Sequence, residues 1–393
     1  METLHRIHQL LVEQTVSPVR RTLMDEIDWS QRLIGIKGTR GVGKTTFLLQ
    51  YAKERFSPDD PSCLYINMNN FFFTRNNLVE FAGDFVKQGG KVLLIDQMFK
   101  YPRWSADLRT CYYQYPQLQI VFTGSSVMRL KEENPDLKDI VSLYYLRGFS
   151  FREFLNLQSH HQFHAYTLEE ILRSHTQIAR TVLNLVNPLD YFPDYLHHGF
   201  YPFYLEHRNF EENLLKTMNM MIEVDILFIQ QIELKYLSRI KRLFHLIALG
   251  GNVSPNISQM ANEIQTSRTT VMNYIKYLTD ARLTNMLYPC GESFPKKPAK
   301  LFMHNSNLLY AIYPQQINRQ NVIDTFFMNT LYKDHKLYKG EKSTTFNVDG
   351  TLNFKICQQE AHFRNVSTNW YAIDQLLEGT GNCIPLWLFG FLY

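Results

Sequence analysis

Residues 38–46 read Gly38-Thr39-Arg40-Gly41-Val42-Gly43-Lys44-Thr45-Thr46. This stretch satisfies every fixed position of the phosphate-binding pattern G-x-x-x-x-G-K-[ST]. A compact apolar run at residues 33–37 precedes it, and a helical pattern over residues 45–56 follows it. Glycines let backbone N–H groups close around phosphates, and a helix N-terminus adds partial positive charge. We therefore predict that residues 38–46 bind ATP, with Lys44 at the β- and γ-phosphates and the Thr45 hydroxyl on Mg²⁺.

Three more short apolar runs follow, at residues 62–67, 91–96 and 118–123, and helical stretches separate them. Nearly continuous apolar runs of this length are typical of buried strands in a parallel sheet. The sequence therefore predicts an α/β fold, a P-loop NTPase parallel sheet with helices on both faces.

The run at residues 91–96 ends in Asp96, the position at which the Walker B carboxylate of P-loop ATPases holds Mg²⁺. The next residue is Gln97, where hydrolytic members of this class usually carry a glutamate. An amide accepts a hydrogen bond from water but is not a general base near neutral pH. We predict that Asp96 and Gln97 lie at the catalytic centre and that turnover of ATP is slow.

The run at residues 118–123 is followed by Gly124, Ser125 and Ser126. Two interpretations of the serines remain open. A hydroxyl here would lie between Asp96 and the γ-phosphate and sense it, and Ser125 is our candidate for this catalytic role. Alternatively, a serine caps a helix that begins near residue 127.

Four segments occur in order along the chain, at residues 38–46, 94–104, 120–126 and 146–155. Together they resemble the bacterial and archaeal AAA-type P-loop ATPases that carry a C-terminal winged helix and a degenerate restriction-endonuclease-like domain. The tail, residues 384–393, resembles Bacteroides-type members.

The resemblance implies that Lys44, Thr45 and Asp96 bind nucleotide and Mg²⁺. Gln97 departs from the acidic residue that is commoner in the family, which agrees with slow turnover. Residues 149–154 close the ATPase core in such proteins. Within them, Arg152 is either a phosphate-sensing finger or the surface partner of a carboxylate, and we favour the surface pair.

We expect four segments: an ATPase domain at residues 1–155, a helical region at 156–236, a winged helix at 237–305 and a small α+β nuclease-like domain at 306–393. The winged helix follows from helical patterns on both sides of a tight turn at residues 265–266, and from a basic segment at 296–300.

Two roles are open for this winged helix. Arg268 and Lys276 on its second helix would contact DNA, or the domain would only pack between its neighbours. Asp280, Glu263 and Glu292 offset part of the basic charge. We therefore predict packing, with weak DNA binding at most.

The nuclease-like domain is predicted from a helix that carries Asp324 and from a hairpin with Asp349-Gly350 at its turn. Nucleases of this type use two carboxylates to bind Mg²⁺. Lys355 occupies the position where relatives often carry the second acid. We predict that the fold is kept and that DNA cleavage is lost.

Composition places the chain among ordinary globular proteins. Of its 393 residues 45% are apolar and 20% charged, which excludes a disordered or fibrous chain. Five cysteines occur singly, so we expect no disulfide framework. Residues 1–14 have the pattern of an amphipathic helix. No apolar run approaches the ~18–20 residues of a membrane span, so we expect a cytoplasmic protein with no membrane partner. We expect the histidine-rich stretches at 160–164 and 197–198 to be solvated, not metal-bound.

The leading hypothesis is an ATP-binding, Mg²⁺-dependent ATPase that hydrolyses ATP slowly and couples the nucleotide state to a rearrangement of its C-terminal domains. The alternative is a nucleotide-gated interaction or DNA-binding module with negligible turnover, which recruits a protein partner or associates with itself. A third hypothesis, an ATP-gated nuclease, is disfavoured by Lys355.

Overall fold

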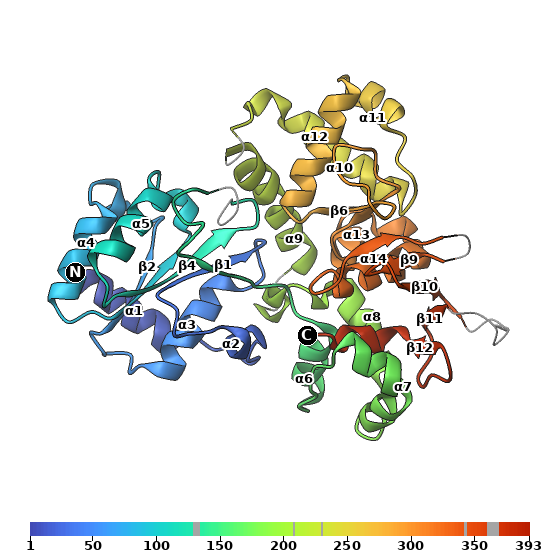
Figure 1. The fold of residues 1–393 in the computed structure, drawn as a ribbon, viewed down its shortest axis with the longest axis horizontal. Coiled ribbons are helices and arrows are strands. Elements are labelled where there is room, and N and C mark those ends of the chain that lie inside the picture. Colours follow the sequence, from blue (N-terminus) through green and yellow to red (C-terminus); the bar gives the residue numbers. More distant parts are fainter. Residues whose placement is uncertain (129–133, 207–208, 229–230, 342–343, 360–368) are drawn as a thin grey trace. The chain divides into compact units, whose positions relative to one another are not determined.

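The computed structural model describes residues 1–393 except 129–133, 207–208, 229–230, 342–343 and 360–368. The chain forms two compact units, Met1–Gly148 and Phe149–Tyr393 (Figure 1). The helix α6 (Phe151–Ser159), which the sequence analysis divides between the first two segments, therefore lies in the second unit.

Unit 1 contains a five-stranded parallel sheet with the order β2-β3-β4-β1-β5. Its strands are β1 (Leu33–Gly38), β2 (Cys63–Asn67), β3 (Val92–Asp96), β4 (Gln119–Ser125) and β5 (Ser142–Tyr145). The connecting helices are α3 (Lys44–Arg55), α4 (Leu78–Lys87) and α5 (Trp104–Gln114). Right-handed crossovers place α3 on one face and α4 with α5 on the other, as Figure 1 shows. The predicted P-loop α/β fold is confirmed.

Four of these strands, but not β5, are predicted from the sequence. Every residue of β5 is only half-buried, and the strand lies at the edge of the sheet beside β1. It therefore lacks the continuous apolar run that marks the four other strands. The opposite edge, β2, is covered by the predicted amphipathic helix α1 (Glu2–Gln14), whose buried face includes Leu4, His8 and Val12. Short helical segments complete unit 1: α2 (Leu23–Glu26), η1 (Phe71–Thr74) and η2 (Met98–Lys100).

Unit 2 begins with helices. They are α6, α7 (Leu168–Leu183), α8 (Phe192–Asp194) and α9 (Phe210–Met220), with short 3₁₀ or π segments η3 (Pro188–Asp190), η4 (Tyr195–Gly199), η5 (Pro202–Glu206), η6 (Met221–Phe228) and η7 (Leu234–Tyr236). Both α6 and α7 start with a capping box, in which Ser150 pairs with Glu153 and Thr167 with Glu170.

Three helices and a two-stranded antiparallel sheet follow. They are α10 (Leu237–Gly250), α11 (Ile257–Glu263), α12 (Arg268–Asp280), β6 (Thr284–Leu287) and β7 (Lys300–Met303). These elements lie within residues 237–305, for which the winged helix stays a prediction. Just after β6, Tyr288 forms an isolated bridge to Tyr338, and its carbonyl accepts a 2.7 Å hydrogen bond from the Lys339 N–H.

The C-terminal part holds a mixed sheet of order β12-β11-β10-β9-β8. Its elements are α13 (Ser306–Ile312), η8 (Pro314–Gln316), α14 (Arg319–Leu331), β8 (Leu337–Lys339), β9 (Phe346–Val348), β10 (Leu352–Cys357), β11 (Trp370–Ile373), β12 (Cys383–Pro385) and η9 (Leu386–Phe391). The predicted hairpin is present, with Asp349 and Gly350 at positive φ.

The tail packs into the core of unit 2. All six residues of η9 are buried, and the segment lies against α6, α7 and α14. In the described part of the chain, no helix is both long and apolar enough to cross a membrane.

Candidate functional site

The phosphate loop joins β1 to α3 in unit 1. Gly41 and Gly43 have φ of 81° and 89°, a conformation that favours glycine. Gly38 is required for a different reason, because a Cβ here would lie 2.5 Å from the Leu146 carbonyl oxygen. The Lys44 Nζ donates hydrogen bonds of 2.8 Å to the carbonyl oxygens of Gly38 and Thr39. The predicted loop residues thus form one turn that leads directly into the N-terminus of α3.

Asp96 lies at the carboxyl end of β3 and accepts four hydrogen bonds. Its Oδ2 accepts from the hydroxyls of Thr45, at 2.7 Å, and Tyr65, at 3.0 Å. Its Oδ1 accepts from the Thr123 hydroxyl, at 2.5 Å, and from the Gln97 backbone N–H, at 3.0 Å. Asp96 is only 1% exposed. The structure therefore brings together the predicted pair Thr45 and Asp96, and adds two hydroxyl groups to it.

These residues fit a magnesium ion. Mg²⁺ prefers hard oxygen ligands and usually keeps several waters, so one hydroxyl and one nearby carboxylate suffice on the protein side. The Thr45 hydroxyl and the buried Asp96 carboxylate are such a pair, beside a loop that is shaped for phosphate. All four hydrogen-bond donors to Asp96 are uncharged groups, so its negative charge stays available for a cation.

Gln97 follows Asp96 in a left-handed conformation, with φ of 55°. Its backbone N–H also donates to the Thr123 hydroxyl at 3.0 Å. A non-glycine residue at positive φ is held there by its surroundings, and such residues cluster at functional sites. Two residues later, the ring of Phe99 lies 5.6 Å from the Arg40 guanidinium carbon, which connects the phosphate loop to the segment after β3.

Ser125 ends β4, in register with Gly38 of the phosphate loop. Its Oγ accepts a 3.4 Å hydrogen bond from the Val127 N–H, in a turn formed by Ser126 and Val127. The helix predicted beyond this turn lies mostly outside the described residues. On β4, the hydroxyl that donates to Asp96 is that of Thr123. The buried Ser126 Oγ has no hydrogen-bond partner in the described part of the chain.

Arg152 corrects both interpretations offered from the sequence. It is buried in unit 2, where its Nε donates to the Tyr393 carbonyl oxygen and its Nη1 to that of Phe163, each at 3.1 Å. The guanidinium therefore ties α6 to the tail and to the loop before α7. It is neither a phosphate finger of unit 1 nor a surface ion pair, because its hydrogen bonds lie in the interior of unit 2.

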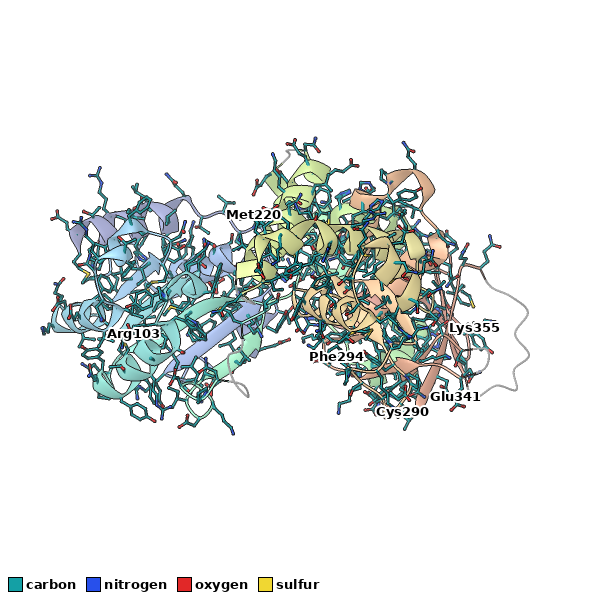
Figure 2. All side chains as sticks on the ribbon, turned by 90° about the horizontal axis from the view of Figure 1, so that it is seen from above. Arg103, Met220, Cys290, Phe294, Glu341 and Lys355 are labelled. Atoms are coloured by element: carbon teal, nitrogen blue, oxygen red, sulfur yellow. The ribbon has the colours of Figure 1, made fainter. Side chains whose placement is uncertain are left out.

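The acids of the C-terminal segment, for which a nuclease-like fold is predicted, have partners of their own. Asp324 accepts a 2.7 Å hydrogen bond from Gln320, and burial raises its pKa to about 6. Asp349 lies 2.7 Å from the His335 ring and also accepts from the Lys336 N–H. Lys355 lies on β10, and Figure 2 shows its side chain at the periphery. Within the described ranges, no group of three His, Cys, Asp or Glu side chains is arranged to hold a metal.

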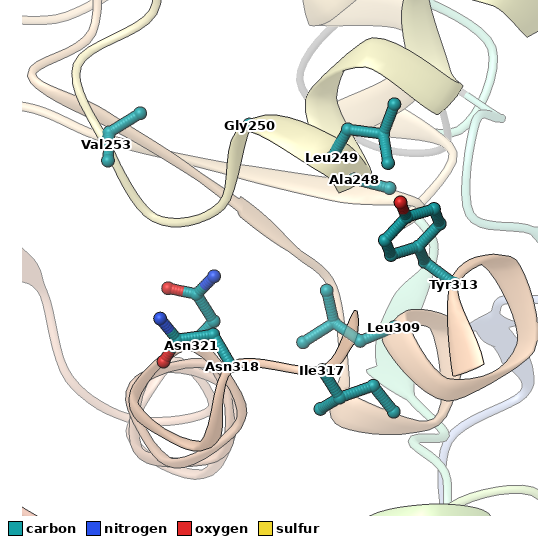
Figure 3. Close-up of a pocket in the computed structure, with 9 residues that line it drawn as sticks. All are labelled: Ala248, Leu249, Gly250, Val253, Leu309, Tyr313, Ile317, Asn318 and Asn321. Carbon is teal, nitrogen blue, oxygen red and sulfur yellow. The ribbon is translucent and has the colours of Figure 1, made fainter. Parts of the chain in front are cut away.

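A separate cavity of about 310 Å³ lies in unit 2. Leu249, Val253, Leu309 and Tyr313 line it together with the amides of Asn318 and Asn321 (Figure 3). Its lining contains no charged side chain, so it lacks the cations that a nucleotide phosphate requires.

Comparison with known proteins assigns a family to part of the chain. The family model of an AAA domain matches residues 30–155, which include the phosphate loop and Asp96. A second model, described as a domain of unknown function (DUF8612), matches residues 189–322. Together with the parallel sheet, the first match identifies residues 30–155 as an AAA-type, nucleotide-binding P-loop domain.

A relative is the uncharacterized protein MJ1637 of Methanocaldococcus jannaschii, which is 27% identical over 285 residues. The match covers 69% of this chain but only 59% of the relative's length. Two solved structures are also similar. PCH-2 of C. elegans is 16% identical, with a TM-score of 0.24 over 44% of this chain and 47% of that one. AMPPCP-bound DnaA from Aquifex aeolicus is 15% identical, with a TM-score of 0.22 over 70% of this chain and 86% of that one.

Tyr65 and Thr123 are two residues of the site that were not predicted from the sequence. Thr123 ends the predicted fourth strand, so its place beside Asp96 follows from the order of parallel strands, whose carboxyl ends share one edge. Tyr65 had no such signal, because an aromatic residue inside an apolar strand reads as core.

Proposed function

We propose that this chain is an ATP-binding, Mg²⁺-dependent ATPase with slow hydrolysis, which couples its nucleotide state to a rearrangement of the C-terminal segments. One observation carries the proposal: the Thr45 hydroxyl and the Asp96 carboxylate lie 2.7 Å apart beside a complete phosphate loop. The positions of Lys44 at the loop and Gln97 next to Asp96 support binding of ATP and slow turnover, respectively.

The chemistry follows from the residues present. The loop N–H groups and Lys44 would neutralise the phosphates, and Thr45 with Asp96 would hold Mg²⁺, which supplies charge stabilisation of the transferring phosphoryl group. Gln97 would orient water through its side-chain amide without removing a proton from it. Ser125 stays our candidate for a γ-phosphate sensor, at the end of the strand next to β1.

The test of nucleotide binding is Lys44→Ala, measured by calorimetry with a non-hydrolysable ATP analogue. Loss of a charge-assisted hydrogen bond of about 1.5–3 kcal/mol predicts an affinity about 10- to 150-fold weaker. The control is Lys138→Ala, which removes an exposed positive charge from the same unit. Undiminished binding by Lys44→Ala would contradict the site.

Arg21 supports the coupling. This buried arginine donates from Nη1 to the carbonyl oxygen of Val42, within the phosphate loop, at 3.1 Å. Its Nη2 donates to the carbonyl oxygens of Arg147 and Gly148, the last residues of unit 1, at 2.7 and 3.0 Å. A movement of the loop on binding phosphate would therefore act on the segment that continues into unit 2.

The coupling is tested by hydrogen exchange of residues 149–393 with and without ATP analogue and Mg²⁺. We expect the wild type to change its exchange in unit 2, and Arg21→Ala to bind nucleotide but to lose this change. An unaltered response in Arg21→Ala would show that the coupling does not pass through this side chain. No response in the wild type would contradict the coupling itself.

We further propose that the segment from α10 to β7 packs and binds DNA weakly at most. Lys276 pairs with Asp280, and Lys296 with Glu292, so two of its cations are already offset. The bridge from Tyr288 to Tyr338 connects the end of β6 to β8. Figure 2 marks Cys290 and Phe294, which follow this bridge in the loop that leads to β7. Tight, salt-sensitive binding to a duplex, lost in Arg268→Ala, would contradict this proposal.

A further inference from the structure

Tyr65 is an unassigned residue that touches the Walker B carboxylate. It lies on β2, next to β3, where Tyr65 is opposite Leu94 and Asn67 is opposite Asp96. Its hydroxyl donates to the Asp96 Oδ2 at 3.0 Å, and the side chain is 4% exposed. A buried tyrosine hydroxyl usually finds a partner, but many neutral partners would serve. Here the partner is the one carboxylate that the proposed magnesium site requires.

The backbone of Tyr65 is held by helix α1. The Tyr65 backbone N–H, on the outer edge of the sheet, donates to the Nδ1 of His8 at 2.9 Å. Helix α1 thereby covers the edge of β2 at this residue. The contact with α1 therefore holds the backbone that carries the phenol.

Two of the four donors bond each oxygen of the Asp96 carboxylate. Thr123 and the Gln97 N–H hold Oδ1, while Thr45 and Tyr65 share Oδ2. Thr45 is the residue whose hydroxyl would bind Mg²⁺. Its oxygen can bind the cation through a lone pair while its O–H still donates to Asp96. Thr45 and Tyr65 would then fix Oδ2 together, and Tyr65 is the one of the two that has no ligand role of its own.

We propose that Tyr65 is a positioning residue for Mg²⁺, which acts by orienting the Asp96 carboxylate through its hydroxyl. This inference rests on the proposed function of the same site. Hydrogen-bond partners of metal-binding groups typically contribute about 10- to 100-fold to metal affinity, because they fix the orientation of the group. The role is one of orientation, since the Tyr65 hydroxyl bonds the Asp96 carboxylate and the ring is buried in the core.

The test compares Tyr65→Phe with Tyr51→Phe. The control Tyr51→Phe also removes one buried tyrosine hydroxyl from unit 1. Tyr51 is 3% exposed, and its hydroxyl donates at 3.3 Å to Gln119 instead of Asp96. Binding of a fluorescent ATP analogue to the full chain is measured in EDTA and then as a function of Mg²⁺ concentration. The readout is the Mg²⁺ concentration at which half of the Mg²⁺-dependent increase in affinity for the ATP analogue is reached.

We expect Tyr65→Phe to need about 10- to 100-fold more Mg²⁺ than the wild type, with the affinity in EDTA unchanged. Tyr51→Phe should match the wild type in both measurements. Equal Mg²⁺ requirements in all three proteins would overturn the role of Tyr65 while leaving the proposed function intact. Loss of binding in EDTA by Tyr65→Phe would also overturn it, because the effect would then be structural. A wild type that binds no nucleotide, or ignores Mg²⁺, would instead contradict the proposed function.

Discussion

His8 joins helix α1 to the edge strand of the sheet, and we predict that acid breaks this connection. The ring is 1% exposed, and its Nδ1 accepts the hydrogen bond from the Tyr65 N–H. Burial, and next the neighbouring charge of His5, lower the pKa of His8 from 6.5 to about 4, against the opposing effect of Asp60. Protonation of Nδ1 would place an N–H donor opposite the Tyr65 backbone N–H, and the hydrogen bond between them would be lost. The Nε2 is buried with no hydrogen-bond partner among the described residues.

The sign and size of the effect follow from these two pKa values. Below pH 6.5 the unfolded chain binds a proton at His8 that the folded chain excludes down to about pH 4. The free energy of unfolding therefore falls as the pH is lowered through this window, and the contribution is fully present above pH 6.5. Between pH 7.5 and pH 5 the loss is about 2 kcal/mol, which corresponds to a factor of about 30 in the equilibrium constant for opening.

The assay is hydrogen exchange of the β2 amides at pH 7.5 and pH 5, corrected for intrinsic exchange rates. It reports the opening of unit 1 separately from that of unit 2. The matched variant is His8→Asn, whose side-chain oxygen can accept the Tyr65 hydrogen bond but does not titrate. We expect the wild type to lose about 30-fold more protection than the variant on acidification. Equal losses in the two proteins would refute the reasoning.

Two further predictions concern turnover and the stability of unit 2. Gln97→Glu should raise phosphate release by about 10²–10⁴-fold, the usual contribution of a positioned general base; an equal rate would mean that chemistry does not limit turnover or that water is activated elsewhere. Arg319→Met should lower the free energy of unfolding by about 3–5 kcal/mol, measured by urea denaturation. It removes the two hydrogen bonds, of 2.7 and 2.8 Å, that Arg319 donates to the buried Asp374. Arg180→Met, which removes an exposed ion pair with Glu378, should be nearly neutral, and equal effects would contradict the prediction.

The nucleotide site was predictable from the sequence because its chemistry is local. The residues from Gly38 to Thr46 are contiguous, and Asp96 ends an apolar run, so spacing alone identifies both. The family match over residues 30–155 agrees with that interpretation. Strand β5 was not predictable in the same way, because a half-buried edge strand needs no apolar run.

Other contacts could not be predicted because they join residues far apart in the sequence. His8 and Tyr65 are separated by 57 positions, and Arg152 and Tyr393 by 241. No rule of sequence spacing predicts that the two residues of either pair are in contact. A single arginine in a helix reads as a surface cation, and only the packing of the tail onto α6 makes Arg152 a donor to buried carbonyl oxygens.

The contrast among four aspartates distinguishes the candidate cation site of unit 1 from three described carboxylates of unit 2. Asp374 is neutralised by Arg319, and Asp349 lies against the His335 ring. Burial raises the pKa of Asp324 to about 6, so this carboxylate approaches neutrality in mildly acidic solution. Asp96 is as buried as any of them, yet its four hydrogen bonds come from uncharged donors. Its charge is thus fixed in place without being cancelled, and a divalent cation is the natural group to cancel it.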